Sequence, residues 1–330
     1  MNTKSFLLSL LVSMLVIVSC KESFDIIAPY KDITIAYGLL DLGEDTTFLR
    51  INKAFLGDGN VLEMVKVEDS SIYVNGLSAS IEEWYNGSVL ATYPLDTMTI
   101  DNKNEGLFYN PYQLLYYAVF EVQPDYHYKL KIIVKNKEVT GETDPVNDFS
   151  MTKPTAGSKF VKFQPEIPTA NVEWESAKNG KRYEVVIRFN FKELKEESPD
   201  TIYRYIDWNL GTFKSLSTQG GEEMYATYQP ASFYTILSNR VPYEDPVEEA
   251  MVTHRFTKNV EFLISVAGDE LNTYMEVNEP TNSIVQEKPD YTNLTNGLGV
   301  FSSRFRKVRV KKIDLTSVDE IKKLNLKFEY

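Results

Sequence analysis

The sequence predicts a mainly β protein, in which an immunoglobulin-like antiparallel sandwich is followed by a second β-rich domain of the α+β type. Short segments of alternating apolar and polar residues recur along the chain and are separated by turn residues. Tyrosine (21 residues) and phenylalanine (18 residues), which both favour strands, are abundant. No repeat of solenoid or propeller length occurs, and a chain of 330 residues more often forms two domains than one.

Residues 31–145 carry the pattern expected of the sandwich. The strongest local signal is Asn86-Gly87, which separates two strand-like segments at residues 80–85 and 88–93. Asn-Gly is a preferred pair for a tight hairpin turn. Short strands at this spacing are typical of an immunoglobulin-sized antiparallel sandwich. Further strands are expected at residues 33–37, 48–55, 71–74, 116–122, 126–134 and 138–143.

A domain boundary is expected near residue 150, because residues 144–168 are rich in Pro, Gly, Ser and Lys, as exposed linkers are. The second domain is therefore predicted at residues 150–330. Its last helix is expected to begin with a capping box formed by Ser317 and Glu320. Other helices are expected at residues 231–239 and 269–276, and strands at residues 171–175, 183–191, 202–208, 252–257 and 260–266.

Cys20 is the only cysteine, and it directly follows an apolar run at residues 6–19 that Lys4 precedes. The run suits the core of a signal peptide but falls short of the roughly 20 residues that span a bilayer. A cysteine at this place resembles the lipobox of bacterial lipoproteins, in which the thiol is acylated. We therefore predict a lipoprotein signal peptide at residues 1–19, lipidation of Cys20, and a tether at residues 20–30. The alternative is an ordinary secretory signal or a short anchor helix.

The chain is acidic, with a formal net charge of −12 from 35 Lys and Arg against 47 Asp and Glu. Nucleic-acid binding depends on neutralising phosphates, so this balance argues against a nucleic-acid partner. It argues equally against peripheral binding to anionic lipid, and the expected contact with the membrane is through N-terminal acyl chains alone. One basic segment, residues 304–312, stands out. It is expected to be a charged edge strand that resists aggregation or a surface for an acidic partner.

No motif for catalysis, a metal or a cofactor is found, so none of the three is expected. The two histidines, His127 and His254, lack the spacing of a zinc site. Residues 76–80 lack the closing glycine of a nucleophile elbow. Residues 101–106 resemble the start of a calcium loop, but Tyr112 stands where a bidentate glutamate is needed. The acidic loops near residues 41–45 and 245–249 are expected to be solvated, with an irregular calcium site as the alternative.

Aromatic residues are the remaining signal, and Trp84, Tyr85, Tyr203 and Trp208 are the candidate ligand-binding residues. Trp84 and Tyr85 are consecutive, so their side chains point to opposite faces of a strand and at most one enters the core. Trp208 ends an expected strand. A ring exposed at such a place can stack on a sugar or grip a peptide. The alternative is that all four pack in the core, as aromatic residues do in any β protein.

Three segments carry a resemblance to a known family. They are Cys20 with the acidic-apolar lead after it, residues 126–143 with their Val-Thr-Gly-Glu-Thr end, and residues 292–301, which read Thr-Asn-Leu-Thr-Asn-Gly-Leu-Gly-Val-Phe. The chain resembles the lipoprotein family catalogued as domain of unknown function 4249, typical of Gram-negative bacteria of the Bacteroidota type. Asn296 and Ser302 stand where that family favours glycine. The resemblance implies an outer-membrane or surface location and an immunoglobulin-like first domain, and it implies no reaction.

The expected function is that of a non-enzymatic, lipid-anchored outer-membrane or cell-surface protein that binds a ligand or an envelope partner. A TonB-dependent transporter is the expected partner, by analogy with the neighbours of such families. Lys21-Glu22 resembles the signal that sends such lipoproteins to the cell surface, although Ser23 replaces the usual second acid. The alternatives are a surface hydrolase with an unrecognised carboxylate site and a purely structural envelope component.

Overall fold

The computed structural model describes residues 33–54, 61–73, 75–101, 104, 106, 112–196, 200–279 and 290–329. The predicted signal peptide, the predicted tether and the predicted lipidation site Cys20 lie outside the described residues. Within those ranges, no helix is long and apolar enough to cross a membrane.

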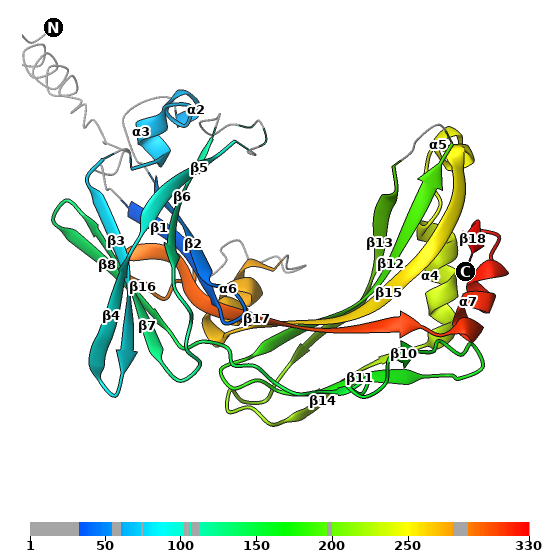
Figure 1. Cartoon of the computed structure of the whole chain (residues 1–330). Coiled ribbons are helices and arrows are strands. Elements are labelled where there is room, and N and C mark those ends of the chain that lie inside the picture. The colour runs from blue at the N-terminus through cyan, green and yellow to red at the C-terminus, as the bar shows by residue number, and fades with distance from the viewer. Residues whose placement is uncertain are drawn as a thin grey trace, which may run out of the picture.

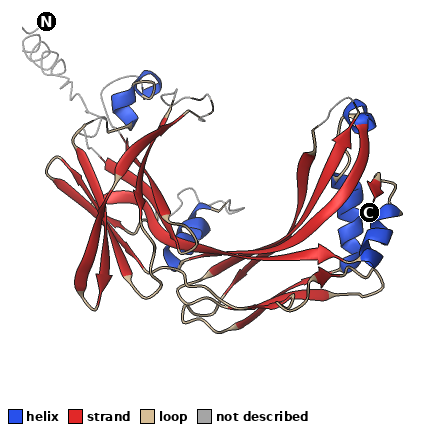
Figure 2. Ribbon diagram, viewed as in Figure 1, coloured by secondary structure: helices blue, strands red, loops and turns tan. Residues whose placement is uncertain are grey.

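The protein is mainly β, which confirms the predicted fold class. Two lobes stand at the ends of a long curved sheet, so that the molecule has the outline of an open U (Figure 1). Strands dominate both lobes, and the helices of the second lobe lie on the outer side of the U (Figure 2). The chain forms a ten-stranded sheet and two smaller sheets of three and five strands.

The first lobe is a sandwich of two sheets. A five-stranded sheet, in the order β16-β8-β7-β3-β4, faces the half of the large sheet ordered β17-β1-β2-β6-β5. The core between them is built from buried aliphatic and aromatic side chains that alternate with exposed ones, as period-2 patterning requires. Its elements are β1 (Ile33–Asp41), β2 (Thr46–Ala54), α2 (Val61–Met64), α3 (Glu68–Ser71), β3 (Leu77–Tyr85), β4 (Ser88–Pro94), β5 (Asp96–Ile100), β6 (Gln113–Val119), β7 (His127–Val134), β8 (Lys137–Thr143) and β16 (Leu294–Thr295).

The Asn86-Gly87 hairpin forms as predicted, and both residues have the positive φ that a tight hairpin turn requires, 49° and 78°. The strand predicted at residues 71–74 is wrong. Glu68–Ser71 form the short helix α3 instead, and Ile72 and Tyr73 follow it as buried residues. Two acids in the first turn of α3 interact favourably with the helix dipole. The strand-like residues that follow them obscured this helix signal in the sequence.

The second lobe packs a three-stranded sheet and helices against one face of the large sheet. Buried aromatic rings of both sheets and of α4 fill the space between them. Its elements are β9 (Met151–Lys153), β10 (Phe160–Val161), β11 (Ala170–Glu175), β12 (Arg182–Lys195), β13 (Ile202–Lys214), β14 (Glu223–Tyr228), α4 (Pro230–Arg240), α5 (Pro246–Met251), β15 (Val252–Ala267), α7 (Leu315–Lys322) and β18 (Phe328–Glu329); α6 (Asp269–Asn278) and β17 (Gly297–Ile313) lie at the junction of the lobes.

Three local expectations for the second half need correction. Residues 252–257 and 260–266 form one strand, β15, with a bulge near residue 258. The segment at residues 144–168 is not an exposed linker, because its apolar residues Val146 and Phe163 are buried in the second core. The cap of α7 is Asp314, whose carboxylate accepts a hydrogen bond from the Ser317 amide at 3.0 Å. Asp314 caps α7 in place of Ser317, because Asp314 directly precedes the helix and its carboxylate reaches a free amide of the first turn.

β17 joins the two lobes. Its residues 297–304 pair in parallel with residues 34–41 of β1, and its residues 304–311 pair with residues 260–267 of β15 in antiparallel fashion. Leu294 and Phe301 therefore lie in the core of the first lobe, although they come from the C-terminal part of the chain. The division into domains at residues 31–145 and 150–330 stays a prediction.

Gly299 is the position at which β17 approaches β1 most closely. Its φ is +112°, and a Cβ built there would lie 2.0 Å from the carbonyl oxygen of Ala36, its partner in the register. We expect Gly299→Ala to lower the free energy of unfolding by about 2–3 kcal/mol, because the strained residue has to push β1 away. Denaturant titration followed by tryptophan fluorescence measures this.

Gly157→Ala is the matched control, since its Cβ meets no atom within 4 Å and its φ is not positive. An equal effect of the two substitutions would show that the parallel β1–β17 joint is not as tight as described.

Candidate functional site

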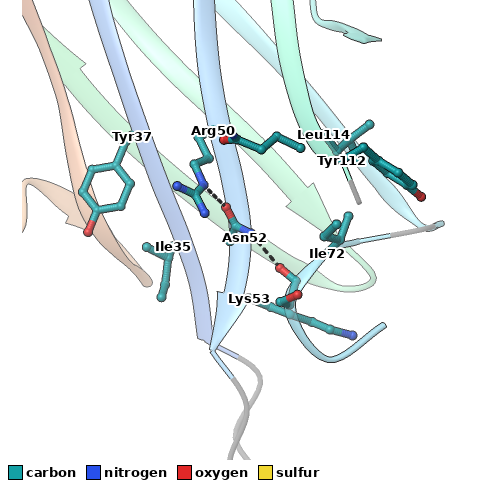
Figure 3. A pocket seen from close by; sticks show the side chains of 10 residues that line it. Ile35, Tyr37, Arg50, Asn52, Lys53, Ile72, Tyr112 and Leu114 are labelled. Atoms are coloured by element: carbon teal, nitrogen blue, oxygen red, sulfur yellow. Dashed lines mark hydrogen bonds between the residues drawn. The ribbon is translucent and has the colours of Figure 1, made fainter. Parts of the chain in front are cut away.

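A cavity of about 260 Å³ lies on the outer face of the first lobe, where β1 and β2 meet the chain after α3 (Figure 3). Ile35, Ile72 and Leu114 give it apolar walls, and Arg50 and Asn52 give it polar ones. Tyr37 and Arg50 are direct partners in the register of β1 and β2, which places both side chains on this face. The cavity combines a guanidinium, an amide and apolar surface, which suits a small polar ligand with an apolar part.

Hydrogen bonds fix the polar wall of this cavity. The Arg50 Nε donates to Asn52 Oδ1 at 2.8 Å, and the Asn52 Nδ2 donates to the Ser71 carbonyl at 2.9 Å (Figure 3). The Tyr37 hydroxyl lies 3.2 Å from the hydroxyl of Tyr274 on α6. Burial raises the pKa of Tyr37 to about 12. Tyr37 is therefore a neutral phenol at physiological pH and not a proton acceptor for catalysis.

Trp84 and Tyr85 lie at the end of β3, where the register with β4 shifts. The Trp84 ring is half-buried, with the Lys129 ammonium 4.7 Å from its centroid, and its Nε1 donates to Glu82 Oε2 at 2.9 Å. Tyr85 is 45% exposed, and its ring lies 5.0 Å from that of Tyr126. Tyr85 is thus the more accessible of the two predicted residues.

His127 lies beside these rings, between two carboxylates. Its Nδ1 is 2.9 Å from Asp144 Oδ1, and its Nε2 is 3.2 Å from Glu142 Oε2. The hydrogen bond with Asp144 raises the pKa of His127 and lowers the pKa of Asp144. Lys129, 2.7 Å from Glu142, lowers the pKa of that carboxyl. These shifts favour a charged ion-pair cluster, not a free base.

Tyr203 and Trp208 point to opposite faces of β13. Tyr203 is 66% exposed and Tyr205 is 56% exposed, and both lie on the face of the sheet opposite the second core. Trp208 is half-buried on the other side, where its ring meets Tyr228 edge-on at 5.4 Å. Tyr203 and Trp208 are five positions apart, an odd number, so the alternation of a strand places their side chains on opposite faces.

The four predicted residues therefore occupy three places and form no single platform. Trp84 and Tyr85 belong to β3 in the first lobe, and Tyr203 and Trp208 lie on opposite faces of β13 in the second. Sequence reasoning missed the cavity at Tyr37 and Arg50, although the alternation along both strands places each of them on an outer face.

No cluster of three or more His, Cys, Asp or Glu suited to a metal ion occurs among the described residues. Comparison with known proteins gave no relative either: no family model and no curated protein matches the chain. The side chains themselves therefore have to support any functional assignment.

His127 offers a direct test of the ion-pair cluster. Because its pKa is raised in the folded protein, protonated His127 stabilises the fold fully below the unfolded pKa of about 6.5, and this contribution disappears as pH rises through the folded pKa. The NMR titration midpoint of His127 should thus lie above 6.5 and fall in Asp144→Asn.

Asp125→Asn is the control, since Asp125 lines a surface depression together with His127 and Asp144 but pairs with Lys178 at 3.2 Å. The chain has only two histidines, so His254→Gln assigns the signals. A His127 midpoint that Asp144→Asn leaves unchanged would contradict the described cluster.

Proposed function

We propose that this protein is a non-enzymatic, lipid-anchored protein of the outer membrane or cell surface that binds a ligand or an envelope partner, beside a TonB-dependent transporter. The observation that carries the binding role is the uncovered face of the large sheet in the second lobe. On that face the side chains of Tyr203 and Tyr205 are exposed to solvent. The opposite face of β13 is partly buried and is the one that packs apolar groups in the core. Exposed rings in such a setting are typical of recognition surfaces.

The arrangement of the acids supports binding in preference to hydrolysis. Glycoside hydrolysis needs a carboxylic acid with a raised pKa facing a second carboxylate across the substrate. Burial raises the pKa of Glu270, but this carboxylate accepts hydrogen bonds from Ser302 at 2.8 Å and Thr143 at 3.2 Å. Glu270 therefore serves to connect α6 with β8 and β17.

Lipid anchoring is the part of the proposal that rests on Cys20 and on the family resemblance. Stable attachment needs two or more acyl chains, because a single chain binds a bilayer only marginally. The described fold begins at Ile33, so the predicted tether of residues 20–30 separates it from the anchor.

We expect Cys20→Ala to leave the protein unacylated and to move it from the membrane to the soluble fraction. Incorporation of labelled palmitate and fractionation of cells measure this. Ser23→Ala is the control and should stay in the membrane fraction. Palmitate labelling of Cys20→Ala would exclude lipidation at this residue.

The binding role is tested by purifying tagged, acylated protein from envelope membranes. We expect the double variant Tyr203→Ala and Tyr205→Ala to recover several-fold less of any envelope component than the wild type does. Tyr225→Ala is the matched control, because Tyr225 is 62% exposed on β14, in a different sheet of the same lobe. Equal recovery with the double variant would argue against binding through this face. Protease shaving of intact cells then distinguishes the cell surface from the periplasmic side.

A further inference from the structure

We propose that the uncovered face of the second lobe binds an acidic polysaccharide, a glycan chain that carries carboxylate or sulfate groups. The inference deepens the proposed binding function and rests on it. The surface is called the open face below. It consists of Arg188, Asn190, Lys192, Tyr203, Tyr205, Phe256, Lys258 and Asn259.

Strand register places these residues in rows. Lys192 of β12 pairs with Tyr203 of β13 on one side and with Phe256 of β15 on the other. Two residues along β12, Asn190 pairs with Tyr205 in the same way. Successive rows are about 7 Å apart, because a strand rises by about 3.4 Å per residue. A tyrosine that recurs in two successive rows suits a polymer of repeated units.

The bulge in β15 adds a further cation to the open face. Asn190 pairs with Asn259 and Phe191 with Thr257, so Lys258 is the extra residue between them. Its ammonium lies 4.9 Å from the ring centroid of Tyr203. A bulge that re-aims one side chain toward a surface is a common feature of binding sites in sheets.

Each aromatic ring of the open face lies next to a cation. The Arg188 guanidinium is 4.1 Å from the Tyr205 ring centroid, and the Lys192 ammonium is 5.0 Å from that of Phe256. Within the described part of the chain, neither Lys192 nor Lys258 forms an ion pair with a carboxylate. These two ammonium groups are therefore available to an anionic ligand.

The surrounding charge limits where that anion can bind. Asp207 pairs with Arg188 at 2.7 Å, and Glu261 is the partner of Arg188 in β15. This acidic row closes the cationic area on one side, and Glu329, the partner of Phe256 in β18, lies on the other. An anionic group therefore fits only between them, at Lys192 and Lys258. In a chain with net charge −12, two unpaired cations beside exposed rings form a local site for acidic groups.

Side-chain chemistry favours a glycan over a peptide. An extended peptide gains main-chain hydrogen bonds by adding to a free strand edge, and β13 is the only such edge beside the described part of the open face, since β12 lies between β13 and β15. A ligand that lies across the open face itself meets side chains alone. The Asn190 Nδ2 donates to Asn259 Oδ1 at 2.7 Å, which leaves Asn190 Oδ1 and Asn259 Nδ2 for hydroxyl groups. The tyrosine rings can stack on the apolar face of a sugar.

Binding of polygalacturonate, measured by affinity electrophoresis of the acylated protein in detergent, tests the proposal. We expect the wild type to bind polygalacturonate more tightly than neutral dextran, with affinity falling as salt rises. The double variant Tyr203→Ala and Tyr205→Ala should bind roughly tenfold more weakly. The double variant Lys192→Ala and Lys258→Ala should lose the preference over dextran.

Two controls match these variants. Tyr225→Ala removes an exposed tyrosine of the same lobe, and Lys159→Ala with Lys162→Ala removes two exposed lysines outside the open face. All four positions of the test variants are exposed, so the substitutions leave the core unchanged. Circular dichroism checks that each variant folds. Binding that the controls weaken as much as the test variants do would overturn the proposal.

The outcomes separate the ligand class from the proposed function. Equal binding of poly-glutamate, with the same sensitivity to the variants, would identify an acidic protein segment as the ligand instead. No binding of polygalacturonate or of a sulfated glycan, while envelope recovery still depends on Tyr203 and Tyr205, would overturn the glycan and keep the binding function. Loss of both effects would overturn both proposals.

Discussion

The continuous backbone of β17 is the constraint on which the rest of the structure depends. One strand completes the sandwich of the first lobe by pairing with β1 and then becomes part of the curved sheet of the second lobe by pairing with β15. At the crossing point its buried residues are serines. The Ser303 hydroxyl donates to the Asp144 carbonyl at 2.8 Å and accepts from the Val146 amide at 3.0 Å. The cores of the two lobes both end at this point. Hydrogen bonds of buried serine hydroxyls with the backbone therefore take the place of apolar packing there.

The same junction determines where the candidate sites lie. α6 follows directly from β15, and its first residues bond to β17 through the Gly268 amide and the Ser303 carbonyl at 2.9 Å. α6 thereby brings Tyr274 to Tyr37, with ring centroids 5.8 Å apart, beside the cavity of the first lobe. That cavity and the open face of the second lobe thus lie on either side of β17 in the large sheet.

Local patterns in the sequence predicted what local physics determines. Asn86-Gly87 requires positive φ at both residues, and the alternation of β12 leaves no other assignment than a half-buried strand. The parallel pairing of β1 with β17 joins residues about 260 positions apart, and no local signal marks it. Val146 and Phe163 were likewise concealed among turn-forming residues, because composition does not report which few side chains a distant sheet buries. In the candidate site, the alternation of a strand is enough to predict that Tyr203 and Trp208 point to opposite faces. The cations beside the rings could not be predicted in this way, because they come from neighbouring strands and their positions depend on the strand register.

The open face also depends on the charges buried directly beneath it. Lys192 and Glu193 are consecutive, so one side chain reaches the open face and the other points inward. The Glu193 carboxylate accepts hydrogen bonds from Arg255 at 3.1 Å and from Arg204 at 3.1 Å, and Arg255 also donates to Glu249 at 2.8 Å. Burying these charges is costly, and it is tolerated only because each charge has several well-placed partners. Such a network fixes the side-chain directions where β12, β13 and β15 lie side by side. The rows of Lys192 and Tyr203 are then already ordered before a ligand arrives, which lowers the entropy that binding has to overcome.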